Sequence, residues 1–176
     1  AFQDDKQKKQ IPVCVIATKG EEAISDTDEQ EKYKFVTNEK YPGCYIFVSS
    51  WTTDEDGNEV FTDCSSLFNK WLLRIEHDKY LVLAHNAGKY DFHFIQNDIN
   101  EHGYDVECEP LVKGNKYLQC VVRGKTEVQD KKKVKMKNWS ITFGDSMNHI
   151  IASLSNIPKM YNMESSLINY RLYKDQ

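Results

Sequence analysis

The sequence lacks the short motifs that mark the commonest catalytic folds. No Walker or GxGxxG phosphate loop, no GxSxG nucleophile turn and no HExxH zinc pair occurs in its 176 residues. It also lacks an apolar run long enough to span a bilayer, and the first residues, AFQDDKQKKQ, do not resemble a signal peptide. These absences exclude the usual nucleotide-binding and hydrolase templates. They predict an intracellular protein without a membrane partner, and leave mitochondrial, viral and cytoplasmic locations open.

Proline and glycine are scarce, at 4 and 8 residues, and no linker rich in them divides the chain. With 40% hydrophobic residues and no internal repeat, we expect a single domain over residues 1–176. The net charge of -4 argues against a uniformly basic nucleic-acid binder, although a local basic surface is compatible with it.

The five cysteines are odd in number and contain no CxxC pair. This pattern favours buried free thiols in a reducing compartment, with a structural zinc site as the alternative. The cysteines are Cys14, Cys44, Cys64, Cys108 and Cys120.

Hydrophobic periodicity predicts strands and helices in alternation. Strands are expected over 11–19, 44–51, 59–63 and 79–86, and helices over 64–78 and 90–103. Segment 20–43 should be a solvent-exposed connection that contains a short helix. Residues 44–63 should contain a hairpin, and Ser65 or Ser66 should cap the helix that follows. Residues 116–146 should form two long strands around a lysine-rich turn, followed by a helix over 147–157 that Pro158 ends. This order predicts an α/β layer with parallel pairing in its centre.

A polar cluster follows the strand expected over 79–86. His85 and Asn86 end the strand, and Tyr90 and Asp91 begin the next helix. Loops at the carboxyl ends of such strands usually form ligand sites, and an Asp there could hold Mg²⁺. The alternative is structural: Asp91 stabilises the helix start and Asn86 only ends the strand.

A second strand-to-helix junction occurs at Asp145-Ser146. Because it repeats the first arrangement, both polar sets are expected to open onto one edge of the sheet. Ser146 suits a phosphate contact or a plain helix cap equally well.

Lysines alternate with Val134 and Met136 between residues 131 and 137. This is the pattern of a strand with one charged face, which could track a nucleic-acid backbone or protect a solvated edge. The lysines proposed as backbone contacts are Lys133, Lys135 and Lys137. Among the histidines, His93 and His149 are expected to pack and His77 and His102 to be exposed.

Two stretches, HNAGKYDFHFI at 85–95 and ITFGDSMNHIIASLSNIPKMYNM at 141–163, resemble the exonuclease domain of protein-primed family B DNA polymerases. These are the enzymes of certain phages, adenoviruses, linear plasmids and self-synthesising transposons. The first stretch is similar to the family's second exonuclease motif, and the second to its segment that touches single-stranded DNA. KYLQCVVR, FNKWLL and QIPVCVIA are similar to further elements, so the resemblance covers nearly the whole chain.

The resemblance implies a ribonuclease H-like fold, a mixed sheet flanked by helices. It also implies 3′ to 5′ excision by two Mg²⁺ ions that four carboxylates hold. Asp91 would be a catalytic and metal-binding carboxylate, and the single-stranded 3′ end of DNA would contact the other five site residues. Those residues are His85, Asn86, Tyr90, Ser146 and Met147.

The sequence departs from the family where its other carboxylates should be. The first motif, Asp-x-Glu on the central strand, should precede Ala1, and the adjacent Asp4 and Asp5 do not replace it. The Tyr-x-x-x-Asp motif is also missing, because Tyr170 and Asp175 have the wrong spacing, and ESSLINY lacks the lysine expected there. One Asp cannot hold two Mg²⁺ ions, so we expect the chain alone to be inactive.

Three hypotheses follow. In the first, the chain is a fragment of a protein-primed DNA polymerase, and its start at Ala1 without Met favours this hypothesis. In the second, it is a degenerate exonuclease-like module that serves as a structural or nucleic-acid-binding subunit. In the third, it is a ribonuclease H-like domain of unrelated function. Without its central strand the sheet would expose unpaired edges, which another polypeptide could fill.

Overall fold

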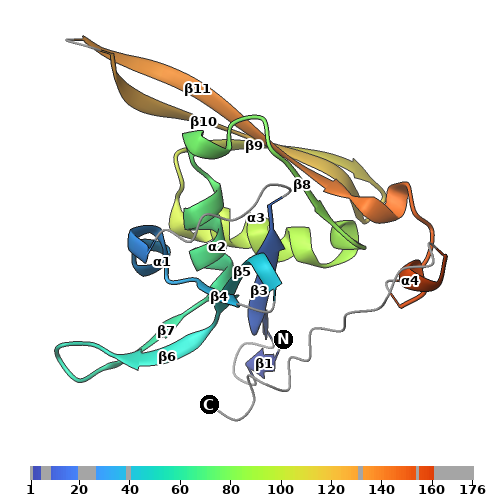
Figure 1. Ribbon diagram of the computed structural model, residues 1–176, viewed down its shortest axis with the longest axis horizontal. Coiled ribbons are helices and arrows are strands. Elements are labelled where there is room, and N and C mark those ends of the chain that lie inside the picture. The colour runs from blue at the N-terminus through green and yellow to red at the C-terminus, as the bar shows by residue number, and fades with distance from the viewer. Residues whose placement is uncertain are drawn as a thin grey trace.

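A four-stranded sheet contains the two longest described strands, β10 (Lys116–Asp130) and β11 (Lys133–Asp145) (Figure 1). The computed structural model describes residues 2–4, 9–19, 27–38, 41–130, 133–153 and 155–160. In the sheet, β8 (Leu81–Ala84) and β11 are parallel neighbours, and β10 and β9 (Val106–Lys113) follow in antiparallel order. The mixed α/β class and the parallel pair were both predicted. Strand β9 was not, because Pro110 and its charged residues hide the apolar pattern.

A second sheet has three strands, in the order β3 (Cys14–Thr18), β5 (Tyr41–Val48) and β4 (Val36–Asn38). Two separate hairpins pair β1 (Phe2–Asp4) with β2 (Lys9–Ile11), and β6 (Ser50–Thr53) with β7 (Glu59–Thr62). The second hairpin confirms the prediction for 44–63. Its turn is closed by the Asp54 carboxylate, which accepts the backbone N–H groups of Asp56 and Asn58.

Helix α2 (Cys64–Leu72) and helix α3 (Asp91–His102) contact each other, and α1 (Thr27–Tyr33) contacts α2. The residue that caps α2 is Asp63, whose carboxylate accepts the N–H of Ser65, so the predicted serine cap was wrong. Gly103 ends α3 as predicted, with a φ of 60° that suits glycine. Among the described residues, no helix is long and apolar enough to cross a bilayer.

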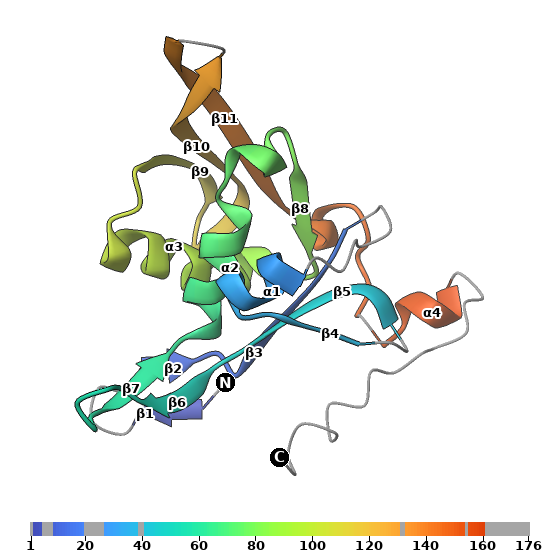
Figure 2. The ribbon, with the colours of Figure 1, turned by 60° about the vertical axis from the view of Figure 1, so that its left-hand side comes forward.

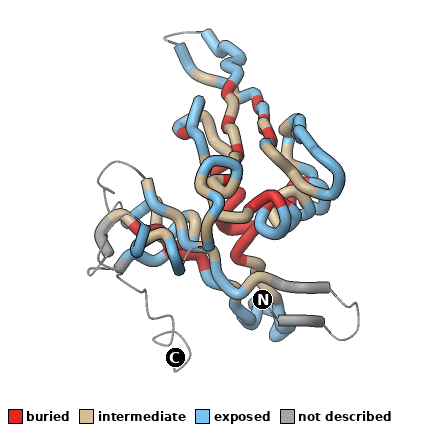
Figure 3. The backbone as a smooth tube through the Cα atoms, turned by 90° about the vertical axis from the view of Figure 1, so that its right-hand side faces the viewer, coloured by how far each residue is buried: buried red, intermediate tan, exposed pale blue. Residues whose placement is uncertain are grey.

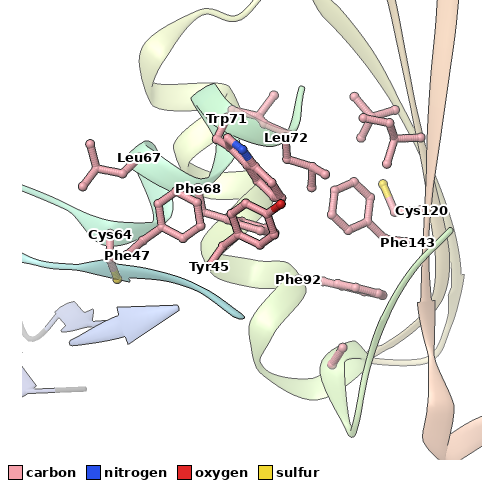
Figure 4. Packing of buried hydrophobic residues seen from close by; sticks show 14 of the residues in the cluster. Tyr45, Phe47, Cys64, Leu67, Phe68, Trp71, Leu72, Phe92, Cys120 and Phe143 are labelled. Atoms are coloured by element: carbon pink, nitrogen blue, oxygen red, sulfur yellow. The ribbon is translucent and has the colours of Figure 1, made fainter. Parts of the chain in front are cut away.

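The core lies between the two sheets and helices α2 and α3. Figure 4 shows the rings of Tyr45, Phe47, Phe68 and Trp71 gathered on one side, with Phe92 and Phe143 facing them. The Phe47 ring is fully buried and contacts Phe68 edge-on at 5.5 Å. Residues from the inner faces of both β3 and β8, including Val15 and Val82, pack against this same core. The two sheets are therefore joined through side chains and helices.

The helix predicted over 147–157 is wrong. Residues Ser146–Asn148 form one tight turn, the next residues are irregular, and α4 (Ile157–Met160) includes Pro158 instead of ending at it. A tertiary contact accompanies the irregular backbone: His85 Nε2 lies 2.6 Å from the carbonyl oxygen of Ala152. That carbonyl is bound by a distant side chain rather than by a helical N–H.

Burial corrects several predictions about single residues. Cys44, Cys64 and Cys120 are buried free thiols as expected, but Cys14 is exposed. His77, predicted to be exposed, is buried: its ring packs at a tilt against that of Trp71, with ring centres 4.8 Å apart, and its Nδ1 lies 2.9 Å from the carbonyl oxygen of Leu72. His102 is exposed as predicted, but His93 and His149 are exposed as well, so the prediction that these two pack was wrong.

Candidate functional site

The parallel pairing of β8 with β11 brings two distant loops together. Asp145 is the register partner of Ala84, so the residues that follow both strands leave the sheet at one edge. We call the residues 85–91 and 145–147 the two-loop site. The prediction that both polar sets share one sheet edge is confirmed.

His85 joins the two loops. Its Nδ1 lies 3.0 Å from Ser146 Oγ, and its Nε2 faces the Ala152 carbonyl oxygen. A carbonyl can only accept, so Nε2 carries the hydrogen, and in the neutral ring Nδ1 accepts from the Ser146 hydroxyl. The imidazole therefore fixes the orientation of Ser146 rather than pointing into solvent.

Asp145 holds the loops from beneath. Its buried carboxylate accepts N–H groups from Asn86 at 2.9 Å, Gly88 at 3.2 Å and Met147 at 2.9 Å. Lys116 Nζ lies 3.3 Å from the same group. Burial alone would raise the pKa of Asp145, but the Met147 and Gly88 N–H groups and Lys116 outweigh it, and the pKa is lowered. This role of Asp145 was not predicted, because a carboxylate that accepts three backbone N–H groups from two loops is evident only once those loops meet.

Gly88 is required by this geometry. A Cβ atom there would lie 2.0 Å from the Tyr117 carbonyl oxygen, so the loop passes too close to β10 for any side chain. Asn86, with a φ of 63°, adopts the left-handed conformation that Asn tolerates well. The backbone conformation therefore accounts for the residue types at Asn86 and Gly88 without a bound ligand.

Asp91 is the first residue of α3 and is exposed as a whole. Partial desolvation of its carboxyl group by the surrounding protein raises its pKa; its own N–H opposes this, and the Asp145 charge adds to the increase. The residue stays accessible to solvent, which screens these interactions. The nearby Tyr90 is 43% exposed, and its ring meets Phe94 edge-on at 5.0 Å.

The described residues do not by themselves fit a pair of Mg²⁺ ions. Asp145 is already saturated by donors, which leaves Asp91 as the accessible carboxylate of the two-loop site. Throughout the described ranges, no three His, Cys, Asp or Glu side chains come together as a metal site would require. Asp4 ends β1, whereas Asp5 and residues 161–176 lie outside the described part of the chain.

A pocket of about 370 Å³ lies beside the two-loop site, between α3 and the start of α2. Tyr90 and Phe94 form one wall, and Asp63 and Asp98 contribute carboxylates. Asp98 is buried, and accepts Asn69 Nδ2 at 2.7 Å and faces His102 Nδ1 at 2.9 Å. The sequence signal for this pocket is a polar stripe at four-residue spacing along α3, formed by His93, Asn97 and Glu101.

Lys133, Lys135 and Lys137 are far from the two-loop site. They occupy the opposite end of β11 from Asp145, and eight residues of extended strand separate Lys137 from Asp145 by roughly 26 Å. The structure therefore joins His85, Asn86, Tyr90, Asp91, Ser146 and Met147 in one region, and leaves the lysines in another.

Comparison with family models, with curated protein sequences and with solved structures finds no match to this chain.

Proposed function

We propose that the two-loop site binds the single-stranded 3′ end of DNA, as the proofreading exonuclease domain of a protein-primed DNA polymerase. The observation that carries the proposal is the contact between the two motifs that suggested it. His85 of the first motif holds Ser146 of the second at 3.0 Å, and Asp145 binds the backbone of both loops.

The surface chemistry supports a strand end as the ligand. Tyr90 offers an exposed ring on which a base can stack, and the adjoining pocket is within the size range of small-ligand sites. Asn86 and Met147 flank Asp145 on the two loops. In the proposed domain Asp91 would be one ligand of the Mg²⁺ pair, which activates water and stabilises the leaving oxygen.

An added strand would complete the site. Among the described residues, β8 pairs with β11 alone, and its Leu81 and Leu83 side chains are 60% and 56% exposed. The opposite edge of the same sheet, β9, has Pro110 and exposed glutamates, the usual protection of a natural edge. β8 has neither, and β3, whose Ile16 is also exposed, is likewise the edge of its sheet. We infer that a further strand, bearing the other carboxylates, pairs with β8.

The alternative is a catalytically dead exonuclease-like module that serves as a structural or nucleic-acid-binding subunit. The saturation of Asp145 favours it, because the described site then offers one accessible carboxylate. A ribonuclease H-like domain of another function is the third candidate. The genomic sequence on both sides distinguishes the first two: an upstream Asp-x-Glu and downstream polymerase motifs support the polymerase, and stop codons support the independent subunit.

The direct experiment measures binding of a single-stranded oligonucleotide and Mg²⁺-dependent release of its 3′ nucleotide. The chain alone should bind the strand and release nothing, and Tyr90→Ala should weaken binding, whereas the control Tyr104→Phe should not. Robust release that Asp91→Ala abolishes would contradict the claim that the site is incomplete. Equal binding by Tyr90→Ala and the native chain would contradict the assigned contact.

A further inference from the structure

Strands β10 and β11 extend beyond the rest of their sheet as a two-stranded arm (Figure 1). Pairing with β9 ends at the Val106↔Gly124 pair, and pairing with β8 starts only at Leu81↔Thr142. We define the arm as residues 125–130 and 133–138. The burial view colours its distal part as exposed (Figure 3), and the rotated view places it away from the second sheet (Figure 2).

The arm is fixed at its base. The ring of buried Trp139 fills the space above Gly124, where a Cβ atom would lie 2.1 Å from the ring. Its Nε1 donates to Thr126 Oγ1 at 3.0 Å, which ties both strands together where the arm leaves the sheet. A two-stranded hairpin in water is otherwise marginally stable, so this anchor and the continuous ladder are what keep it extended.

The arm has one basic face. Side chains alternate along a strand, so Lys133, Lys135 and Lys137 point to the same side as Trp139. Their cross-strand partners are Asp130, Val128 and Thr126. Lys135 pairs with Asp130, but both side chains are at least half exposed, so this ion pair is weak and exchangeable.

The opposite face is different. Val134 and Met136 lie there, 60% and 59% exposed, and no described part of the chain covers them. Lys125 and Glu127 also lie on this face, and their charges offset each other, whereas the three lysines of the basic face outnumber Asp130. On a protein whose net charge is -4, the net positive charge of the described arm therefore lies on one side.

We propose that the basic face of the arm binds the phosphate backbone of duplex DNA, independently of its sequence. Charge complementarity supplies the attraction. Successive lysines on this face are about 6.8 Å apart, two residues of strand, which equals the rise of two nucleotides at about 3.4 Å each. Two strands also fit the width of the B-form major groove, whereas the major groove of duplex RNA is too narrow.

The arm binds a duplex rather than a single strand because it lacks stacking groups. Proteins that hold single strands combine positive charge with aromatic side chains. Residues 125–138 contain no aromatic residue, and the nearby Trp139 is buried. This inference extends the proposed function, since a primer end has a duplex behind it, but duplex binding by the arm does not require the two-loop site to act.

The test measures binding of the full chain to a labelled blunt duplex of about 20 bp, two helical turns, across a series of salt concentrations. The variant changes Lys133, Lys135 and Lys137 to Gln, and the control changes Lys32, Lys70 and Lys113, which lie outside the arm, to Gln. The arm variant should bind at least about tenfold more weakly, and the slope of log K against log salt should fall by about 2.7, or 0.9 for each lost phosphate contact. The control loses the same three charges, so any loss of affinity that it shows measures the general effect of charge. Once that loss is subtracted, the control should bind the duplex as the native chain does.

Three results would overturn the inference. One is a native chain that binds no duplex, and another is an arm variant with unchanged affinity and slope. The third is loss of affinity for a matching single strand alone, which would make the arm a single-strand contact. Tyr90→Ala separates this inference from the proposed function, because it should leave duplex binding intact while weakening binding of strand ends.

Discussion

The His85 imidazole and the Ser146 hydroxyl, 61 residues apart in sequence, lie 3.0 Å apart in the structure. The contact exists because the strands that precede these residues are parallel neighbours. On the other side of the ring, His85 Nε2 contacts the Ala152 carbonyl, so the same side chain also binds the segment that follows the two-loop site. One side chain therefore positions both a DNA-contact candidate and the chain that follows it.

Replacing His85 should release that segment. His85→Ala leaves the Ala152 carbonyl and Ser146 hydroxyl without their partner, and should lower the free energy of unfolding by about 1–3 kcal/mol. Hydrogen exchange should accelerate over residues 147–153 first. The exposed His149 serves as a matched control, and His149→Ala should change neither quantity; equal effects of the two variants would contradict the role of His85.

Replacing the Asp145 carboxylate should be more damaging. Asp145→Asn keeps the shape but gives up the charge that three N–H groups and Lys116 share, so we expect a loss of about 3 kcal/mol in urea unfolding. The exposed Asp105 is the control, and Asp105→Asn should have little effect.

The pH dependence of stability should report on Asp145 as well. Its pKa is lowered in the folded state, so its contribution is complete above the unfolded value of about 3.9 and is lost as the pH falls through the lower folded pKa. Asp145→Asn should lose that part of the acid transition. An unchanged acid transition in the variant would show that the carboxylate is not stabilised as described.

His77 should make folding sensitive to mild acid. Burial lowers its pKa despite the hydrogen bond to Leu72, so the folded protein resists protonation. The unfolded chain takes up the proton first, and stability should therefore decline as the pH drops below the unfolded value of about 6.5. His77→Phe, which keeps a ring against Trp71, should flatten the unfolding free energy between pH 7 and pH 5; a steeper profile would contradict this.

The open edge of β8 should behave differently from the protected edge of β9. Leu83 and Leu111 lie on these two edges and are 56% and 57% exposed. Either leucine changed to Lys should alter stability by no more than about 0.5 kcal/mol, because neither is buried. Only Leu83→Lys should prevent an added strand from pairing. Co-purification with the polypeptide encoded beside this chain, or with a synthetic peptide of that sequence, would measure the pairing. Equal retention by both variants would remove β8 as the docking edge.

Local pattern predicted the elements better than it predicted what caps and joins them. The helices around Phe68 and Phe92, the hairpin at Asp54 and the stop at Gly103 all follow from periodicity and turn residues within a few positions. The helix expected after Ser146 is absent, and the Ala152 carbonyl in that segment instead contacts a side chain 67 residues away, which no local pattern specifies.

Burial of polar residues was the least predictable property. His77 and Asp145 look ordinary in sequence, yet both are almost completely buried. Asp145 accepts N–H groups from both loops, whereas His77 pairs Nδ1 with the Leu72 carbonyl and leaves Nε2 without a partner among the described residues. The meeting of the two motifs could be foreseen from their shared position at strand ends, but the detailed contacts could not. The pocket along α3 depends on how that helix faces α2, which no local pattern specifies.

The most direct test of the central proposal compares a linear single strand with a covalently closed circle of the same sequence. Fluorescence anisotropy would measure the affinity of the native chain and of Tyr90→Ala for both molecules at one salt concentration. We expect the native chain to bind the linear strand more tightly than the circle, and Tyr90→Ala to bind both equally weakly. Equal binding of line and circle by the native chain would contradict recognition of a 3′ end.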